Sequence, residues 1–80
     1  MRELVEFLAR SVVHRPGEVR VREIEGGRTV RIEISEPPGE VGKVIGRQGR
    51  VIRAIRVLAG AAASLQGKRV RVSVVEQEGS

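Results

Sequence analysis

The chain has 80 residues, 40% of them hydrophobic and 31% charged, which indicates one small globular domain. It contains no cysteine, no aspartate and one histidine, so disulfides are excluded and most catalytic constellations lack a member. No apolar run reaches the roughly 20 residues that a membrane-spanning helix needs. The first residues carry glutamates where a signal peptide would be apolar. We therefore expect a cytoplasmic, non-enzymatic domain without a metal or cofactor.

The net charge of +5 is unevenly distributed along the chain. Residues 1–40 carry seven basic and eight acidic side chains, whereas residues 41–80 carry eight basic and two acidic ones. The second half therefore holds a net charge of +6. A field of one sign attracts polyanions, which makes nucleic acid the leading partner class. A basic amphipathic helix on a membrane surface is the weaker alternative, because the single aromatic residue, Phe7, lies in the acidic half and is expected in the core.

The first half predicts one helix and a hairpin. Apolar residues recur at helical spacing over residues 2–14, with polar residues on the other side. Alternation from Val19 onward predicts a strand, with a bulge near Ile24 where the pattern slips. Two glycines at 26–27 then predict a tight turn into a second, antiparallel strand over 30–34.

The second half predicts two helices and a final strand. Residues 40–45 form a short helical turn, residues 50–63 a longer helix, and residues 70–74 alternate as a strand. The order α-β-β-α-α-β over residues 1–76 predicts a two-layer α+β domain, in which three helices cover one face of a three-stranded sheet. The tail, residues 77–80, is expected to fray.

The functional signal lies between the two predicted helices of the second half. There Gly46 and Gly49 enclose Arg47 and Gln48, and apolar residues on both sides can anchor the helices in the core. Two glycines permit a turn tight enough to bring the backbone close to a ligand. The helix that starts at Arg50 presents unpaired N–H groups and the positive end of its dipole, an arrangement that attracts phosphate.

A nucleic-acid backbone suits this loop better than a free nucleotide. The chain contains neither of the glycine motifs typical of kinase-like or dinucleotide sites. Its single aromatic residue, Phe7, is expected in the core, whereas most single-strand-binding modules stack bases on exposed aromatic residues. Lys43, Arg50 and Arg53 lie within about a turn of the loop and can add charge.

Four segments of the chain resemble the KH domain, whose Gly-x-x-Gly loop clamps the backbone of about four single-stranded nucleotides. More narrowly, they resemble the small bacterial KhpA family, also called YlqC. The segments are Glu3-Leu4-Val5-Glu6, Gly42-Lys43-Val44-Ile45-Gly46-Arg47-Gln48-Gly49-Arg50, Ala54-Ile55-Arg56 and Gly67-Lys68-Arg69-Val70. The resemblance implies a type II KH fold and an RNA chaperone that pairs with itself or with the larger KH protein KhpB. It also implies a link to cell shape and cell-wall synthesis.

The resemblance also implies which residues contact RNA. The loop would clamp the backbone, α-helical residues before it would form one wall of a base-binding groove, and the second strand near Ile32 would form the other. With the neighbouring charges, the expected RNA-binding residues are Val41, Gly42, Lys43, Ile45, Gly46, Arg47, Gln48, Gly49, Arg50 and Arg53.

Small residues at the end of the long helix indicate a second property. Gly60 is surrounded by alanines over residues 59–63, which leaves a smooth surface for close helix approach, to the sheet or to a second subunit. An alternative hypothesis is therefore an assembly adaptor that mainly dimerises and whose RNA affinity is incidental.

Overall fold

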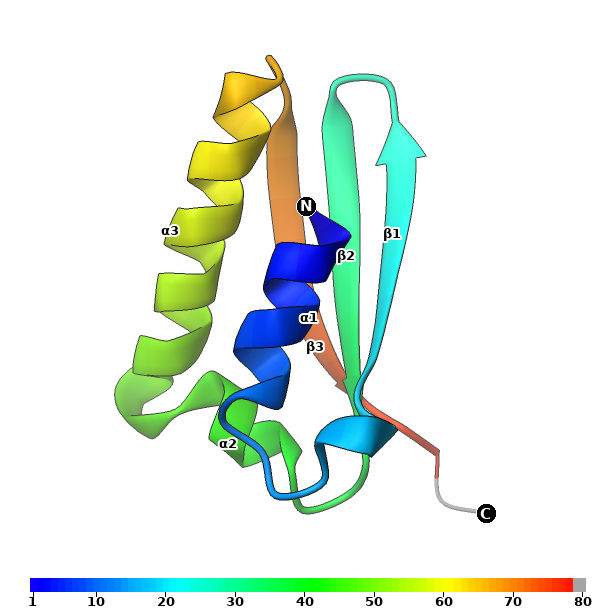
Figure 1. The fold of residues 1–80 in the computed structure, drawn as a ribbon, viewed down its shortest axis with the longest axis vertical. Helices are drawn as coiled ribbons and strands as arrows, with labels where there is room; N and C mark the ends of the chain where they lie inside the picture. The colour runs from blue at the N-terminus through cyan, green and yellow to red at the C-terminus, as the bar shows by residue number, and fades with distance from the viewer. Residues whose placement is uncertain (79–80) are drawn as a thin grey trace.

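The computed structural model describes residues 1–78 and has two layers, a sheet and a layer of helices (Figure 1). Short 3-10 turns at Pro16–Glu18 and Arg47–Gly49 connect the main elements. In chain order these elements are α1 (Arg2–Arg10), β1 (Arg20–Gly26), β2 (Thr29–Glu36), α2 (Val41–Ile45), α3 (Arg50–Leu65) and β3 (Arg69–Glu76). The predicted element order and α+β class are confirmed.

The three strands form a mixed sheet in the order β1-β2-β3. β1 and β2 pair antiparallel, and β2 and β3 pair parallel, because the chain crosses over through α2 and α3 before β3 begins. Pairing of β1 with β2 is continuous from Arg20 opposite Ser35 to Gly26 opposite Thr29. The predicted bulge near Ile24 is therefore wrong. Ile24 breaks the pattern because it lies on the outer face, 38% exposed, while regular alternation continues.

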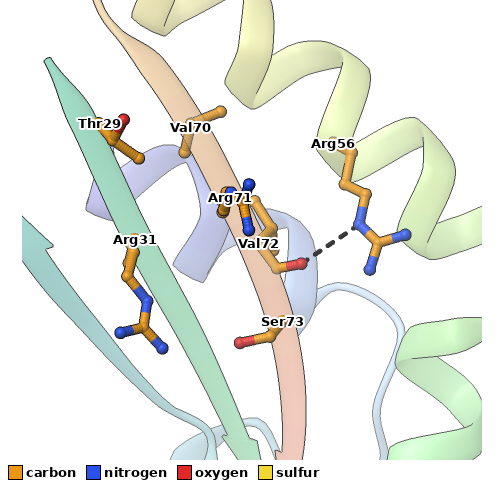
Figure 2. A pocket seen from close by; sticks show the side chains of 7 residues that line it. All are labelled: Thr29, Arg31, Arg56, Val70, Arg71, Val72 and Ser73. Carbon is orange, nitrogen blue, oxygen red and sulfur yellow. Dashed lines mark hydrogen bonds between the residues drawn. The ribbon is translucent and has the colours of Figure 1, made fainter.

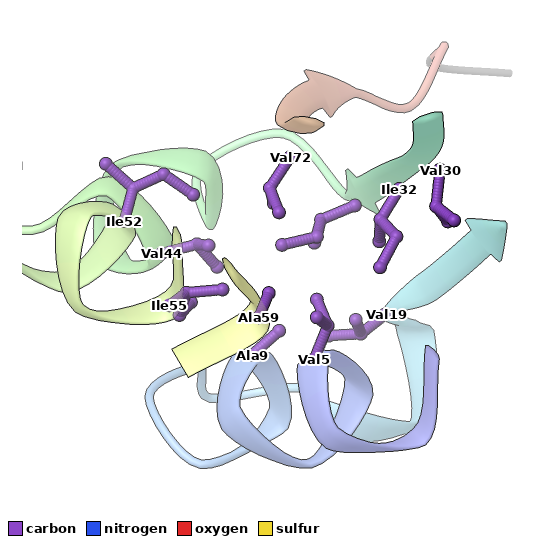
Figure 3. Close-up of a cluster of buried hydrophobic side chains, with 11 residues drawn as sticks. Val5, Ala9, Val19, Val30, Ile32, Val44, Ile52, Ile55, Ala59 and Val72 are labelled. Carbon is purple, nitrogen blue, oxygen red and sulfur yellow. The ribbon is translucent and has the colours of Figure 1, made fainter. Parts of the chain in front are cut away.

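The hydrophobic core lies between the sheet and the helices (Figure 3). Val30, Ile32 and Ile34 of the central strand point inward at period two and are fully buried. α1 packs on β1 and β2, and α3 packs on β3. The other buried residues that complete the core are Val5, Ala9, Val19, Val44, Ile52, Ile55, Ala59 and Val72.

The first helix is shorter than its periodicity predicts and leaves Phe7 outside the core. α1 ends at Arg10, where the Ser11 hydroxyl donates to the Phe7 carbonyl at 2.7 Å and local bonding replaces further helical turns. Val5 and Ala9 face the sheet, so helical spacing turns Phe7 to the solvent, where it is 69% exposed. The expectation that Phe7 is a core residue is therefore wrong.

The end of the chain is tied to the sheet as far as Gln77. Its backbone N–H donates to the Glu36 carbonyl at 2.6 Å, and its side-chain amide donates to the carbonyls of Glu18 and Ser35. Of the rest of the predicted frayed tail, Glu78 is exposed and outside any helix or strand, and residues 79–80 lie outside the described residues. Within residues 1–78, every helix is too short or too polar to cross a membrane.

Candidate nucleic-acid interface

The loop between α2 and α3 has a backbone that two glycines make possible. Gly46 has φ 77° and ψ 171°, a region that is essentially restricted to glycine. Gly49 has φ 71°, and Gln48 is the single non-glycine residue of positive φ, at 55°, within residues 1–78. Gly46 also donates to the Gly42 carbonyl at 2.8 Å and so closes α2. The chain therefore passes from α2 to α3 within four residues, of which Arg47 and Gln48 are exposed.

The start of α3 has no side-chain cap and no compensating negative charge, and the Arg50 N–H donates to the Arg47 carbonyl. Gly49 is the N-cap residue and supplies no side-chain cap, and the first turn of this 16-residue helix contains no acidic residue. Helix starts ordinarily attract carboxylates, because the dipole and the free N–H groups are positive there. Here Arg50 occupies the first position. An arginine at the start of a helix that has no cap and no carboxylate destabilises the isolated helix and favours the binding of an anion.

The predicted basic residues play three different parts around the loop. Arg47 is exposed, and within residues 1–78 no carboxylate lies within ion-pair distance of it. Arg53 donates to the Gln48 carbonyl, so it holds the strained loop backbone, and Arg50 reaches Gln48 Oε1 at 3.4 Å. Lys43 lies 3.7 Å from a carboxylate oxygen of Glu40. Arg47 is thus the cation of the loop that is freest to meet a phosphate.

Glu40 anchors the site, and the sequence analysis missed it. Its side chain is almost fully buried and accepts a hydrogen bond from the His14 backbone N–H at 3.3 Å. Its carboxylate oxygens lie 3.7 Å from Arg15 Nε and 3.7 Å from Lys43 Nζ. Burial alone would raise its pKa, but the His14 N–H and the nearby positive charges lower the pKa below its ordinary value of 4.5. Glu40 therefore ties the connector after α1 to the start of α2. Its position as the first residue of a predicted helical turn was the available signal.

Glu36 is a second buried carboxyl group, and it has no partner. It continues the inward series of β2, is fully buried, and neither carboxylate oxygen has a hydrogen bond within residues 1–78. Burial, helped by the negative charge of Glu40, raises its pKa from 4.5 to about 7. Glu36 is the last residue of β2, and the chain passes from it through residues 37–40 into α2.

The apolar part of the expected groove is only partly as predicted. Ile45 is 38% exposed beside the loop and Val41 is half-buried, so α2 offers aliphatic surface next to the clamp. Ile32, expected on the opposite wall, is fully buried in the central strand and cannot contact a ligand. α2 packs against β3. The expectation for Ile32 is wrong because this side chain points to the inner face of the sheet and packs in the core.

An α-β-β-α-α-β chain with a parallel β2–β3 pair and a Gly-x-x-Gly loop between two helices is a KH domain of type II. The family model described as "KhpA/KhpB, KH domain" matches residues 2–74, so the chain belongs to this family.

Named relatives align along almost the whole chain. A protein of Clostridium perfringens named RNA-binding protein KhpA is 43% identical over 75 residues, which cover 94% of this chain and all of the relative. Proteins of the same name from Aquifex aeolicus and Caldanaerobacter subterraneus are each 45% identical, covering 95% and 94% of this chain and 96% and 100% of the relatives. These relatives carry the names of RNA-binding proteins, not of enzymes.

Proposed function

We propose that this chain binds single-stranded RNA without catalysing a reaction, with the loop Gly46–Gly49 clamped on the sugar-phosphate backbone. The observation that carries the proposal is the uncapped, acid-free start of α3 beside an exposed Arg47 that has no ion-pair partner within residues 1–78. A phosphate seated there would receive backbone N–H groups, the helix dipole and a guanidinium together. The names of the relatives support RNA as the nucleic acid.

The surroundings of the loop favour a single strand over a duplex. Ile45 and Val41 present aliphatic surface beside the clamp, and unstacked bases can lie against such a surface. Because Arg53 already holds the Gln48 carbonyl, the loop is preorganised before RNA arrives. Of the ten expected residues, we assign the phosphate contacts to the side chains of Arg47 and Gln48, because the N–H groups of Gly49 and Arg50 already donate within the loop. Gly46, Gly49 and Arg53 would shape the loop.

The double variant R47D/Q48D tests the clamp. It places two carboxylates where phosphate would approach and leaves the core untouched, since both side chains are exposed. The matched control R28D/Q66D changes the same residue types at exposed positions of the hairpin turn and of the far end of α3. Filter binding of a labelled single-stranded RNA at two salt concentrations should show a marked loss of affinity for R47D/Q48D and none for R28D/Q66D, with unchanged melting temperatures. Near-normal affinity of a folded R47D/Q48D would refute the clamp.

Self-association through α3 is the second candidate function, and a specific surface favours it. Five apolar residues share the solvent-facing side of the helix at spacings of three and four: Ala54, Val57, Leu58, Ala61 and Leu65. Val57 is 70% exposed and Leu65 is 91% exposed, which is unusual for large apolar side chains on one helical face. We call these five residues the α3 stripe. Ala59 and Ala63 of the predicted smooth surface are buried in the interior, which agrees with the alternative that this surface approaches the sheet.

The variant A61Y tests whether the stripe joins two copies, since a ring at its centre would separate two packed helices. Light scattering should give a lower mass for A61Y than for A61S, which keeps the size of the residue. An equal mass for both variants, whether that of one chain or of two chains, would place any self-association elsewhere. Pairing would also raise RNA avidity, because two clamps on one strand bind at a high effective concentration.

The finer roles implied by the family are extensions of this proposal. They are chaperone activity on RNA, pairing with a KhpB-like KH protein, a cytoplasmic location and a link to cell shape and cell-wall synthesis. Acceleration of annealing of two complementary RNA strands by the wild type, and not by R47D/Q48D, would support the chaperone role. Co-purification of a second KH protein through the α3 stripe, lost in A61Y, would support the mixed pair.

A further inference from the structure

The face of the sheet that the helices leave open is strongly basic. Strand alternation and the pairing register direct five arginines to this face: Arg20, Arg22, Arg31, Arg69 and Arg71. All five are exposed, and Glu33 is the single acidic residue among them, 3.8 Å from Arg22. Charge of mixed sign would keep such a face soluble equally well. Solubility therefore does not explain the excess of positive charge on this face.

The centre of this face places like charges next to each other. Arg31 of β2 and Arg71 of β3 are direct register partners, and Figure 2 shows them on neighbouring strands. Like charges directly opposite each other destabilise a sheet. Within residues 1–78 neither guanidinium has a carboxylate within ion-pair distance. An unbalanced pair of this kind is stabilised when a polyanion covers it.

A hollow extends the basic face around the free edge of β3. It has a volume of about 840 Å³, and its lining includes Arg31 and Arg71 on the open face and Arg56 from α3. Arg56 Nε donates to the Val72 carbonyl at 3.2 Å, which fixes the guanidinium at the strand edge. That bond uses Nε alone, and Nη1 and Nη2 can meet phosphate oxygens. Three guanidinium groups thus lie along one path across β3.

We propose that the open face of the sheet is a second RNA-contact surface that binds the phosphate backbone. It consists of the five arginines of that face, which we call the sheet-face cluster, together with Arg56. It would act independently of the Gly46–Gly49 loop. The choice of RNA as the polyanion rests on the proposed function. The surface carries no aromatic side chain, so it would follow the backbone without stacking or reading bases. Because the loop lies at one end of the helical layer and this face lies behind the sheet, one chain could hold two RNA segments at once (Figure 1).

The test compares R31Q/R71Q with two matched variants of the full chain. R2Q/R10Q removes the same charge from α1, where both arginines pair with Glu6, and R31K/R71K keeps the charge of the sheet face. The measurement is the slope of log affinity against log salt concentration for an unstructured 20-nucleotide RNA. Two lost phosphate contacts should reduce the slope by about 1.4 in R31Q/R71Q. The slope should stay unchanged in R2Q/R10Q and R31K/R71K.

Site mapping separates this proposal from the loop clamp. In nitrogen-15 spectra of R47D/Q48D, added RNA should still shift the amide signals of Arg31, Arg71 and Ser73. If R47D/Q48D shows no such shifts and R31Q/R71Q binds like R2Q/R10Q, the sheet-face proposal is overturned while the clamp stands. If R47D/Q48D binds normally and R31Q/R71Q does not, the clamp fails and the sheet face is supported. Movement of the same signals on protein dilution without RNA would mean that a second copy covers this face, which also overturns the proposal.

Discussion

Gly46 lies against Val51 so closely that no side chain fits between them. A Cβ atom built on Gly46 would come within 2.5 Å of Val51 Cγ2 and 2.9 Å of the Val51 backbone nitrogen. Gly49, the other glycine of the loop, would place its Cβ at 3.9 Å from Ile52, which is an ordinary contact. The two glycines of one motif are therefore required for different reasons: Gly46 for space and backbone conformation, Gly49 for backbone conformation alone.

The first prediction follows from this difference. G46A should destabilise the domain by at least about 2 kcal/mol, because it adds a steric overlap with backbone to a conformation restricted to glycine. G49A should cost only about 1 kcal/mol, the penalty for a left-handed residue without a clash. Thermal unfolding checks the order, with about 4 to 8 °C expected per kcal/mol for a domain of this size. Equal melting temperatures for the two variants would contradict the loop geometry.

This distinction shows what periodicity could predict and what it could not. The helical period of 3.6 residues and the strand period of 2 residues located the elements and the inward residues of β2, because these periods depend on local geometry alone. Phe7 was misplaced because hydrophobicity was weighed above its position on the helix. Contacts between residues distant in the sequence, such as Glu40 with the His14 N–H, depend on how α1 and α2 pack. No pattern along the chain contains that information.

The same limit applies within the candidate site. The Gly-x-x-Gly loop between two helices was predictable, since glycines and flanking apolar residues are local features. The different contacts of the basic residues could not be predicted. Arg53 donates to the Gln48 carbonyl and Arg47 stays exposed, and this difference depends on the folded conformation of the loop. Glu36 could have been found from the strand period, had β2 been extended by two residues beyond Ile34.

Arg53 is expected to act on RNA binding through the loop and not through its charge. R53K keeps the positive charge but loses the guanidinium that reaches the Gln48 carbonyl. We expect R53K and R53Q to weaken binding of single-stranded RNA alike, by about fivefold for a hydrogen bond of about 1 kcal/mol. The salt dependence of R53K should equal that of the wild type. Full affinity in R53K would show that the charge alone matters.

Gly60 should be a site where alanine stabilises the isolated chain. A Cβ at Gly60 meets nothing within 4 Å among the described residues, and glycine inside α3 costs about 1 kcal/mol relative to alanine. G60A should therefore raise the free energy of unfolding by about that amount, measured by urea denaturation at low protein concentration. A loss of stability that grows with protein concentration would instead show that a second copy packs against this glycine.

The buried carboxyl of Glu36 should make stability depend on pH in an unusual direction. Its pKa is about 7 in the folded chain against an ordinary 4.5, so the folded state holds a proton that the unfolded state releases. The stabilisation is therefore fully present below about pH 4.5 and is lost as pH rises through about 7. Over this window the free energy of unfolding should fall by at most about 1.4 kcal/mol per pH unit through this group.

The variant E36Q isolates this effect, because glutamine resembles the protonated acid and does not titrate. The difference in unfolding free energy between E36Q and the wild type should grow in favour of E36Q from pH 4.5 to pH 8, measured by urea denaturation. Glu40 acts in the opposite sense, since its lowered pKa confines its effect to pH values below 4.5, where its stabilisation is lost as pH falls. A constant difference across pH 4.5 to 8 would mean that Glu36 is ionised in the folded protein at neutral pH, with a partner for its charge.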